Sequence, residues 1–489
     1  MLFNSQIFVF GFLPLCLTGL VLFRRWALWW LIGMSFLFYG WWNVVHVPLL
    51  AASILANYAA GLRIARGGHA RAWLIAGVSA DLGLLGWFKY AGFLFGIEAT
   101  EAPPLAISFF TFQQIMFLTD CWGDNGSKSA VMVRAGGPPT PYTGKHGEGV
   151  RAPPARTVTQ WPLLHYAAFV SFFPHLIAGP LVRPRDIVPQ LSNLEPDLSA
   201  GLTLFLLGLA KKLVLADLFG AFADIGFDAA AQGEVLTLLE AWAATLSYAL
   251  QIYFDFSAYS DMATGLARMI GVRFPLNFDS PYQATNIADF WRRWHITLGL
   301  FLRDHVYIPL GGNRSVLNLM ATMLLAGLWH GAAWRFVLWG GLHGAMLMGH
   351  ALFRRAGFRL PQPVARLVTL MMVCLAWVPF RADGVPAMAR MLEGLAGLNG
   401  FALPAMIAQL APGIATPVPV LRFLGDARTL SLPEVAACLL LGWTIVLILP
   451  HAQALSERAR AWALVASFAF TVRALCFAPH VVPFLYFQF

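Results

Sequence analysis

The stretch FWRRWHITL, residues 290–298, concentrates charge in a chain that is otherwise strongly apolar. Two arginines and a histidine lie between its tryptophans, and RDH follows at residues 303–305. Asn286 is the expected N-cap of a helix here, with Asp289 as its capping-box partner. Apolar residues at helical spacing predict that this single helix has one apolar stripe, made of Ile287, Phe290, Trp291, Trp294, Leu298, Phe301 and Leu302.

The charges of this segment argue against an ordinary lipid-facing span. Arg292, Arg293, Arg303 and Asp304 lie mostly off the apolar stripe, and each charge at the bilayer centre costs about 2.5–3.5 kcal/mol. The helix is therefore expected at the cytoplasmic interface or as a re-entrant element, with its arginines lining an aqueous entrance. His295, at the edge of the stripe, is expected to point inward.

The segment YIPLGGNR, residues 307–314, adds a glycine pair and a further cation. Backbone amides and guanidinium groups together suit phosphate oxygens. We therefore expect the phosphates of a nucleotide-bearing donor such as acyl-CoA to bind at this entrance. The arginines predicted to bind the donor are Arg292, Arg293, Arg303 and Arg314.

Composition places the whole chain in a membrane. Of its 489 residues, 58% are hydrophobic and 12% are charged, whereas a soluble globular chain carries about 25% charged residues. We predict an all-α polytopic protein with about eleven spans of roughly 17–25 residues each, plus re-entrant or interfacial helices. The candidate spans are centred near residues 7–23, 26–45, 48–62, 72–97, 105–121, 163–182, 200–217, 235–254, 316–334, 336–353, 363–380, 433–450 and 461–477.

The net charge of +9 is interpreted as a topology signal. Basic residues cluster at the predicted membrane edges, and the positive-inside rule places those edges in the cytoplasm and the N-terminus outside. Nucleic-acid binding is not expected, because no soluble basic domain is present to carry it. The clusters are Arg24 and Arg25; Arg63, Arg66 and Arg71; and Lys211 and Lys212.

Two stretches interrupt the apolar pattern. Residues 123–160 hold five basic residues, two Pro-Pro pairs and many glycines, a composition that cannot bury enough surface to fold alone. They are predicted to form a flexible cytoplasmic loop. Residues 394–428 are rich in proline and glycine and are predicted to form an extramembrane or interfacial linker.

A second distinctive stretch, LLAGLWHGAAWRFVLWGGLHG, covers residues 324–344. Gly327 and Gly331 form a small-xxx-small face on which a neighbouring helix can pack closely. His330 lies within a predicted span, where an ionisable residue indicates function by default. The alternative is a histidine that only forms a hydrogen bond between helices. The presence of His295 in the cationic segment just upstream favours the functional interpretation.

Paired buried histidines suit acyl transfer. Burial keeps an imidazole neutral and basic, and such a base can take the proton of a hydroxyl as it attacks a thioester, worth about 10²–10⁴ in rate. A second imidazole can orient the acyl group or stabilise the oxyanion. We therefore predict that His330 and His295 are catalytic.

Other polar positions give weaker signals. Asp255 and Asp261 either brace the histidine helices or only cap and pair, and Trp329 is a candidate supporting residue beside His330. His343 and His350 lie two turns apart and are interpreted as packing residues, since no carboxylate or cysteine accompanies them. No metal is expected, and the five scattered cysteines are interpreted as packing residues.

Three segments carry a resemblance to a known family: QIYFDFSAYSDMATGLARMIGVRFPLNFDSPY, FWRRWHITLGLFLRDHVYIPLGGNR and LWHGAAWRFVLWGGLHG. Together they closely resemble the membrane-bound O-acyltransferases (MBOAT), in particular the bacterial alginate O-acetyltransferase-like branch. The resemblance implies a single membrane domain over residues 1–489, a central funnel through the bilayer and an acyl-CoA donor. It places the catalytic histidine on His330 and a second polar position, histidine or asparagine, on His295.

The terminal FLYFQF resembles an F-x-Y-x-x-F motif of extracellular acylation systems. There the tyrosine is proposed to carry the acyl group onward, which here implies Tyr486 as an acyl relay. The alternative is an aromatic anchor at the membrane interface. One departure from the family's pattern is the polar stretch at 123–160, where the branch usually has a short loop.

The resulting prediction is a multi-pass enzyme of the bacterial inner membrane. It would take acetyl groups from cytoplasmic acetyl-CoA and pass them across the lipid bilayer to a periplasmic SGNH-type acetyltransferase, which esterifies an exopolysaccharide such as alginate. Within the same class, the acceptor could instead be peptidoglycan or a lipid-linked sugar. A different class, a proton-coupled transporter or polysaccharide export protein, would use His330 and Asp255 as proton relays. The absence of a visible internal repeat argues against it.

Overall fold

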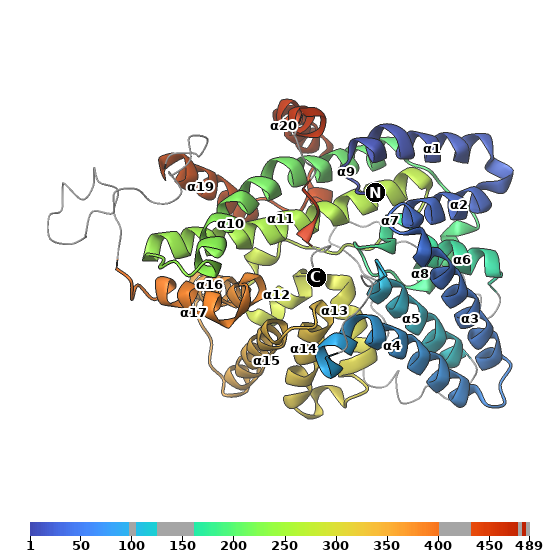
Figure 1. Ribbon diagram of the computed structural model, residues 1–489, viewed down its shortest axis with the longest axis horizontal. Helices are drawn as coiled ribbons and strands as arrows, with labels where there is room; N and C mark the ends of the chain where they lie inside the picture. The colour runs from blue at the N-terminus through green and yellow to red at the C-terminus, as the bar shows by residue number, and fades with distance from the viewer. Residues whose placement is uncertain (97–103, 125–160, 401–431, 478–481, 486–489) are drawn as a thin grey trace. The chain divides into compact units, whose positions relative to one another are not determined.

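The computed structural model describes residues 1–96, 104–124, 161–400, 432–477 and 482–485, and these form helices joined by turns (Figure 1). No strand occurs among the described residues, so the all-α prediction is confirmed. Contacts divide the chain into two compact units. Unit 1 comprises residues 1–205, 262–276 and 303–310, and unit 2 comprises residues 206–261, 277–302 and 311–489. That residues 1–489 form a single domain stays a prediction.

Unit 1 is built mainly from the N-terminal helices. Phe12, Phe38 and Phe173 pack ring against ring in its core, with Phe12 and Phe173 centroids 5.2 Å apart. Helices α3, α4 and α5 pack against one another. The helices are α1 (Leu13–Leu22), α2 (Ala27–Gly40), α3 (Val47–Ala65), α4 (Ala70–Phe95), α5 (Ile107–Asp124), α6 (Leu163–Ser171), α7 (Phe173–Leu176), α8 (Pro184–Leu191) and the first part of α9 (Leu198–Ala210).

Unit 2 holds the stretches that the sequence singled out. The fully buried indoles of Trp339 and Trp377 lie in its core, stacked with centroids 5.9 Å apart. The long helix α11 contributes its part up to Asp261. The helices are α10 (Asp217–Ala231), α11 (Leu238–Ile270), α12 (Ile287–Arg293), α13 (Ile296–Leu302), α14 (Leu317–His330), α15 (Trp334–Arg355), α16 (Gln362–Arg381), α17 (Gly384–Leu395), α19 (Leu432–Ile448) and α20 (Glu457–Phe477).

The prediction of one helix from Asn286 to Leu302 is wrong in one respect. The Asn286 cap is confirmed, because its side chain accepts a hydrogen bond from Asp289 N at 2.8 Å. The helix then breaks into α12 and α13, because His295 adopts a left-handed backbone with φ +44°. Periodicity misses this break, since the apolar spacing continues across it. The Asp289 carboxylate accepts from Thr285 N at 3.2 Å, one residue before the cap.

Four of the described helices are long and apolar enough to cross a bilayer: Val44–Ala65, Trp334–Arg355, Gln362–Arg381 and Glu457–Cys476. Ile7–Leu22 and Arg24–Gly40 together form a pair bent by 101°, which would add a fifth. Several of the candidate spans form shorter or broken helices. The predicted number of about eleven membrane spans therefore stays a prediction. The predicted loop and linker fall almost entirely on residues 125–160 and 401–431, outside the described residues.

Helices α14 and α15 form a tightly packed hairpin that carries His330. A Cβ atom added to Gly327 or Gly340 would lie less than 3.0 Å from a backbone carbonyl of the opposite helix, Phe336 and Met323 respectively. The predicted close approach at Gly327 is therefore confirmed. Gly331 differs from the prediction, because it lies beyond the end of α14 in extended backbone and packs on the Phe336 ring.

Candidate active site

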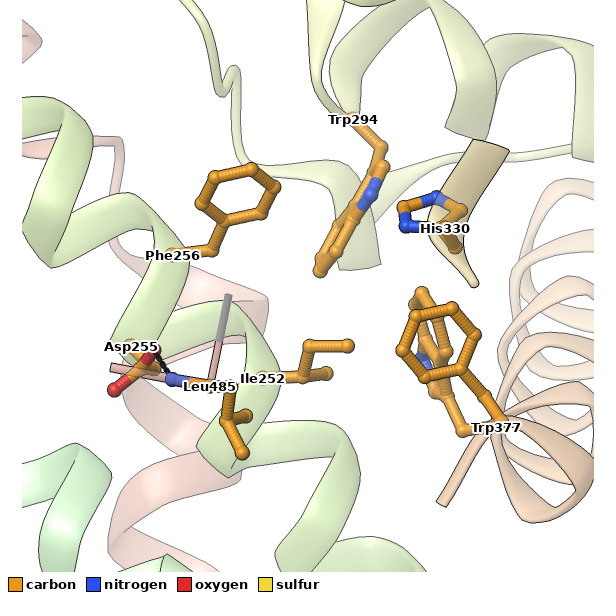
Figure 2. Close-up of a pocket in the computed structure, with 8 residues that line it drawn as sticks. Ile252, Asp255, Phe256, Trp294, His330, Trp377 and Leu485 are labelled. Carbon is orange, nitrogen blue, oxygen red and sulfur yellow. Dashed lines mark hydrogen bonds between the residues drawn. The ribbon is translucent and has the colours of Figure 1, made fainter. Parts of the chain in front are cut away.

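A pocket of about 390 Å³ lies within unit 2 (Figure 2). Its walls are mainly aromatic, and its two ionisable lining residues are His330 and Asp255. Figure 2 shows the imidazole of His330 and the ring of Trp377 on one side, with Phe256 and Ile252 opposite. The lining residues are Ile252, Asp255, Phe256, Trp294, His330, Trp377, Phe380 and Leu485.

His330 is the last residue of α14, so its imidazole lies beside the carbonyl end of that helix. Its ring contacts Trp339 and Phe380, with centroids 5.0 and 5.1 Å away and both rings edge-on. Three or four unpaired carbonyls at a helix C-terminus favour a positive charge nearby. The imidazole therefore lies where the end of the helix favours positive charge.

His295 is buried, as predicted, and is held by Asn277. Asn277 Oδ1 accepts hydrogen bonds from Thr297 N at 3.3 Å and Thr297 Oγ1 at 2.9 Å, which fixes the orientation of the amide. The same oxygen lies 3.2 Å from His295 Nδ1. Because that oxygen can only accept, Nδ1 carries the proton of the neutral ring and the lone pair is on Nε2.

The environment of His295 keeps this neutral form. Burial lowers the pKa of His295 to about 3. Its Nε2 is buried and has no hydrogen-bond partner among the described residues. A non-glycine residue at positive φ stores strain of the kind that clusters at functional sites. The orienting role of Asn277 was missed by the sequence analysis, although the residue lies within the quoted motif PLNFDSPY.

Trp329 connects the two histidines. Its ring centroid lies 4.7 Å from that of His330 and 6.3 Å from that of His295. His295 is not among the residues that line the pocket, but it packs edge-on against the lining residue Phe256 at 4.8 Å. The two imidazoles are thus separated by one layer of aromatic side chains, with Trp329 in contact with both.

Asp255 and Asp261 each pair with a lysine. Asp261 Oδ2 lies 2.7 Å from Lys211 Nζ, and Asp255 Oδ1 lies 2.8 Å from Lys212 Nζ. Both aspartates are thus paired, as in one of the two alternatives, and Asp255 also lines the pocket. The side chain of Lys212 is only 2% exposed, so its charge is paired inside the protein, and its location at a membrane edge stays a prediction. Neighbouring basic residues resemble a topology signal in sequence, whichever way they point.

The predicted donor-binding arginines are distributed over both units. Arg303 belongs to unit 1 and bonds to Asp304 at 2.7 Å. In unit 2, Arg293 lies between Asp289 and Asp279, at 3.1 and 3.7 Å. Arg292 is 72% exposed, and Arg314 is exposed in the turn Gly312–Arg314. Their common role in donor binding stays a prediction.

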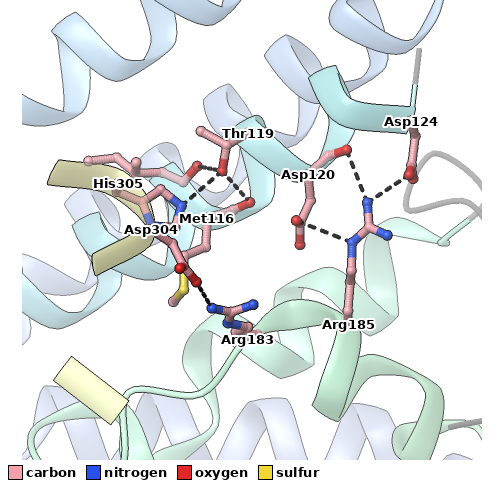
Figure 3. A network of polar contacts seen from close by, with 9 residues as sticks. Met116, Thr119, Asp120, Asp124, Arg183, Arg185, Asp304 and His305 are labelled. Atoms are coloured by element: carbon pink, nitrogen blue, oxygen red, sulfur yellow. Dashed lines mark hydrogen bonds and ion pairs between the residues drawn. The ribbon is translucent and has the colours of Figure 1, made fainter. Parts of the chain in front are cut away.

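A polar network in unit 1 surrounds Asp304 (Figure 3). This carboxylate pairs with both Arg303 and Arg183. Burial opposes its ionisation, but the two guanidinium groups outweigh burial and hold the pKa of Asp304 below its ordinary value. Arg185 on α8 bonds to Asp124 at 2.6 Å and to Asp120 at 3.2 Å. Arg183 and Arg185 are therefore both paired with carboxylates within this network.

His343 has the packing role that the sequence indicated. It is fully buried, and its Nδ1 accepts a hydrogen bond from Trp291 Nε1 at 3.3 Å. Among the described residues, no group of three or more His, Cys, Asp or Glu side chains is placed to hold a metal ion. Tyr486 lies outside the described residues, directly after Leu485 of the pocket.

Comparison with known proteins identifies the class. The profile of the MBOAT, membrane-bound O-acyltransferase family matches residues 82–376, and the chain belongs to this family of membrane-bound acyltransferases. It is 40% identical to a peptidoglycan O-acetyltransferase of Helicobacter pylori over 82% of this chain and 81% of the relative. It is 38% identical to the "Probable alginate O-acetylase AlgI" of Pseudomonas aeruginosa over 87% of this chain and 80% of the relative.

A more distant relative matches only part of the chain. The teichoic acid D-alanyltransferase of Streptococcus thermophilus is 28% identical over 39% of this chain and 50% of the relative. The family resemblance noted from the three motifs is thus confirmed. The chain is a multi-pass membrane enzyme.

Substitution of His295 tests its geometry. We expect His295→Asn to keep the stability of the fold, because asparagine tolerates a left-handed backbone. His295→Ala should lower the free energy of unfolding by about 1–3 kcal/mol, because it leaves Asn277 without this partner and retains the strain. Thermal unfolding of both variants in detergent at pH 7.5 measures the difference. Equal destabilisation by Asn and Ala would contradict the proposed geometry.

The stability of the wild type and that of His295→Asn should also differ in their dependence on pH. The pKa of His295 is about 3 when folded and about 6.5 when unfolded. Between these values the unfolded chain binds a proton that the native chain does not, so wild-type stability falls as pH drops below about 6.5. At pH 5 this loss should be on the order of 1–2 kcal/mol and absent from His295→Asn.

Proposed function

We propose that this enzyme moves acetyl groups from cytoplasmic acetyl-CoA across the bacterial inner membrane for O-acetylation of an exopolysaccharide. About eleven spans and re-entrant elements would surround a central funnel. A periplasmic SGNH-type acetyltransferase would complete the esterification. Two relatives that match most of the chain are named as an alginate O-acetylase and a peptidoglycan O-acetyltransferase, and these names support a polysaccharide acceptor.

The observation that carries the proposal is His330 in an aromatic pocket at the carbonyl end of α14. In the proposed step, a hydroxyl oxygen attacks the thioester carbonyl carbon while His330 takes the hydroxyl proton. The C–S bond then breaks, and the proton passes from the imidazolium to the departing thiolate. The aromatic walls would limit the access of water and so protect the thioester from hydrolysis.

His295 would act beside this base. Its neutral ring, with the Nδ1 proton held by Asn277, has a fixed orientation. It would orient the reacting groups across the layer formed by Trp329 and Phe256. Arg292, Arg293, Arg303 and Arg314 are proposed to guide the phosphates of the donor, and Asp261 and Trp329 to support the site.

Tyr486 is proposed to receive the acetyl group first. Its neighbour Leu485 lines the pocket that contains His330, and this supports a role for Tyr486 at that pocket. The phenol oxygen would attack the thioester, lose its proton to His330 and carry the acetyl group as an ester. The periplasmic partner would then transfer that group to the polymer.

Peptidoglycan is the second candidate acceptor, because a relative 40% identical to this chain bears that name. The sequence alternative of a transporter or export protein gains no support from the family, whose members compared above are named as transferases.

The experiment supplies acetyl-labelled acetyl-CoA to the cytoplasmic face of membrane vesicles. We expect label on Tyr486 in the wild type and release of that label to alginate-like polymer, or to peptidoglycan fragments, when the partner is present. Tyr486→Phe should abolish the labelled ester while His330 is intact, and Phe489→Tyr is the matched control for the C-terminal motif. Direct labelling of polymer by Tyr486→Phe would refute the relay, and proton-coupled movement of substrate across the vesicle membrane that does not depend on acetyl-CoA would favour transport.

A further inference from the structure

Lys212 is a buried lysine with an unusually complete set of partners. Its Nζ lies 2.7 Å from Asp217 Oδ1, 2.8 Å from Asp255 Oδ1 and 3.1 Å from the carbonyl oxygen of Pro483. The ring of Phe484 covers it at 4.9 Å. Lys212 therefore contacts two helices and the C-terminal segment at once.

Asp255 contacts the same segment with its other oxygen. Oδ2 accepts a hydrogen bond from Leu485 N at 2.9 Å (Figure 2). Phe484 packs edge-on against Tyr259, one turn further along α11, with centroids 5.0 Å apart. Phe484 and Leu485 are buried, at 1% and 8% exposure. The segment 482–485 is thus seated in unit 2 by both its backbone and its side chains.

The polar contacts have a physical reason. Residues 482–484 form no helix or strand, so their backbone groups lack regular partners. An unpaired backbone group in an apolar interior is strongly unfavourable. Lys212 supplies a donor to one carbonyl and Asp255 an acceptor to one N–H. A buried ion pair alone is weak evidence for stability, and its best-attested use is to specify register.

We propose that Lys212 and Asp255 bind the C-terminal segment 482–485 and fix its register beside the His330 pocket. They are positioning residues, because they hold the backbone on either side of Phe484 and do not touch the reacting atoms. A shift by one residue would place Phe484 or Tyr486 in the position that Leu485 now occupies. The link to acyl transfer rests on the proposed function, whereas the docking itself does not.

A cysteine reporter tests the docking without any activity assay. Leu485→Cys is introduced with Cys438→Ser and Cys476→Ser, which remove the two less buried native thiols. We expect the label rate with a water-soluble maleimide to rise about tenfold or more in Lys212→Met/Asp255→Leu, as expected for loss of a charged hydrogen bond. The matched control is Lys211→Met/Asp261→Leu, which removes the neighbouring pair between the same elements. An unchanged label rate in the first variant, or an equal rise in the control, would overturn the docking.

A backbone substitution separates docking from folding. Leu485→Pro removes the N–H that bonds to Asp255, whereas Leu485→Ala keeps it and removes the side chain. We expect acetyl transfer to fall about tenfold or more in Leu485→Pro relative to Leu485→Ala, with both ion pairs intact. Equal activity of the two variants would overturn the register role. A raised label rate in Lys212→Met/Asp255→Leu together with full acetyl transfer would support the docking contacts and refute Tyr486 as the relay.

Discussion

His330→Ala should abolish acetyl transfer while the protein still inserts and folds. The imidazole is the base that the proposed step requires, and loss of a positioned base lowers rates by about 10²–10⁴. His330 is only half-buried and ends its helix, so truncation leaves the α14–α15 packing in place. The measurement is acetylation of the acceptor, with thermal unfolding in detergent as the check on folding.

His350→Ala is the matched control for His330. His350 lies on α15, is half-buried and is absent from the pocket lining. Its loss should leave transfer unchanged. His330→Asn adds a second test, since asparagine keeps a polar side chain of similar reach without a base in the physiological pH range. Full activity in His330→Ala or His330→Asn would refute the assignment of the base.

Gly340→Ala should destabilise the α14–α15 hairpin more than any conservative change in the pocket. The added methyl group would collide with the carbonyl of Met323, which belongs to helix backbone and cannot rotate away. Such overpacking costs about 1–3 kcal/mol or more. We expect a lower unfolding temperature and, because His330 is carried by the displaced helix, a loss of transfer.

The adjacent glycine provides the control. A methyl group on Gly341 would meet its nearest atom, Leu324 Cδ2, at 3.6 Å, which is an ordinary contact. Gly341→Ala should therefore be neutral or slightly stabilising, because alanine favours the helix by about 1 kcal/mol over glycine. If Gly340→Ala and Gly341→Ala behave alike, the close approach of the two helices is not what positions His330.

Much of the fold could be predicted from local signals. The apolar composition predicts helices in a membrane. The cap at Asn286 is predicted from that residue and from Asp289, three positions later. Gly327 predicts a close helix pair. These signals lie within one or two turns of the chain. The family could be recognised for a similar reason, because its motifs are continuous stretches.

The missed features all depend on distant residues. The break at His295 involves Asn277, which is 18 residues away and bonds to His295 and to Thr297 just after it. The burial of Lys212 depends on Asp255, 43 residues further along the chain. Neither partner is selected by periodicity or composition. Convergence of the pocket from α11, the junction after α12, α14, α16 and the C-terminal segment likewise requires the tertiary fold.

The two lysine–aspartate pairs have a consequence for biogenesis. Lys211 and Lys212 meet Asp261 and Asp255, so the charges of one segment are neutralised by those of α11. In lipid, each partner alone would carry two charges at about 2.5–3.5 kcal/mol apiece. Insertion with both ion pairs already formed would avoid this cost. The same ionic contacts that hold the finished enzyme together would then also favour one order of assembly over another.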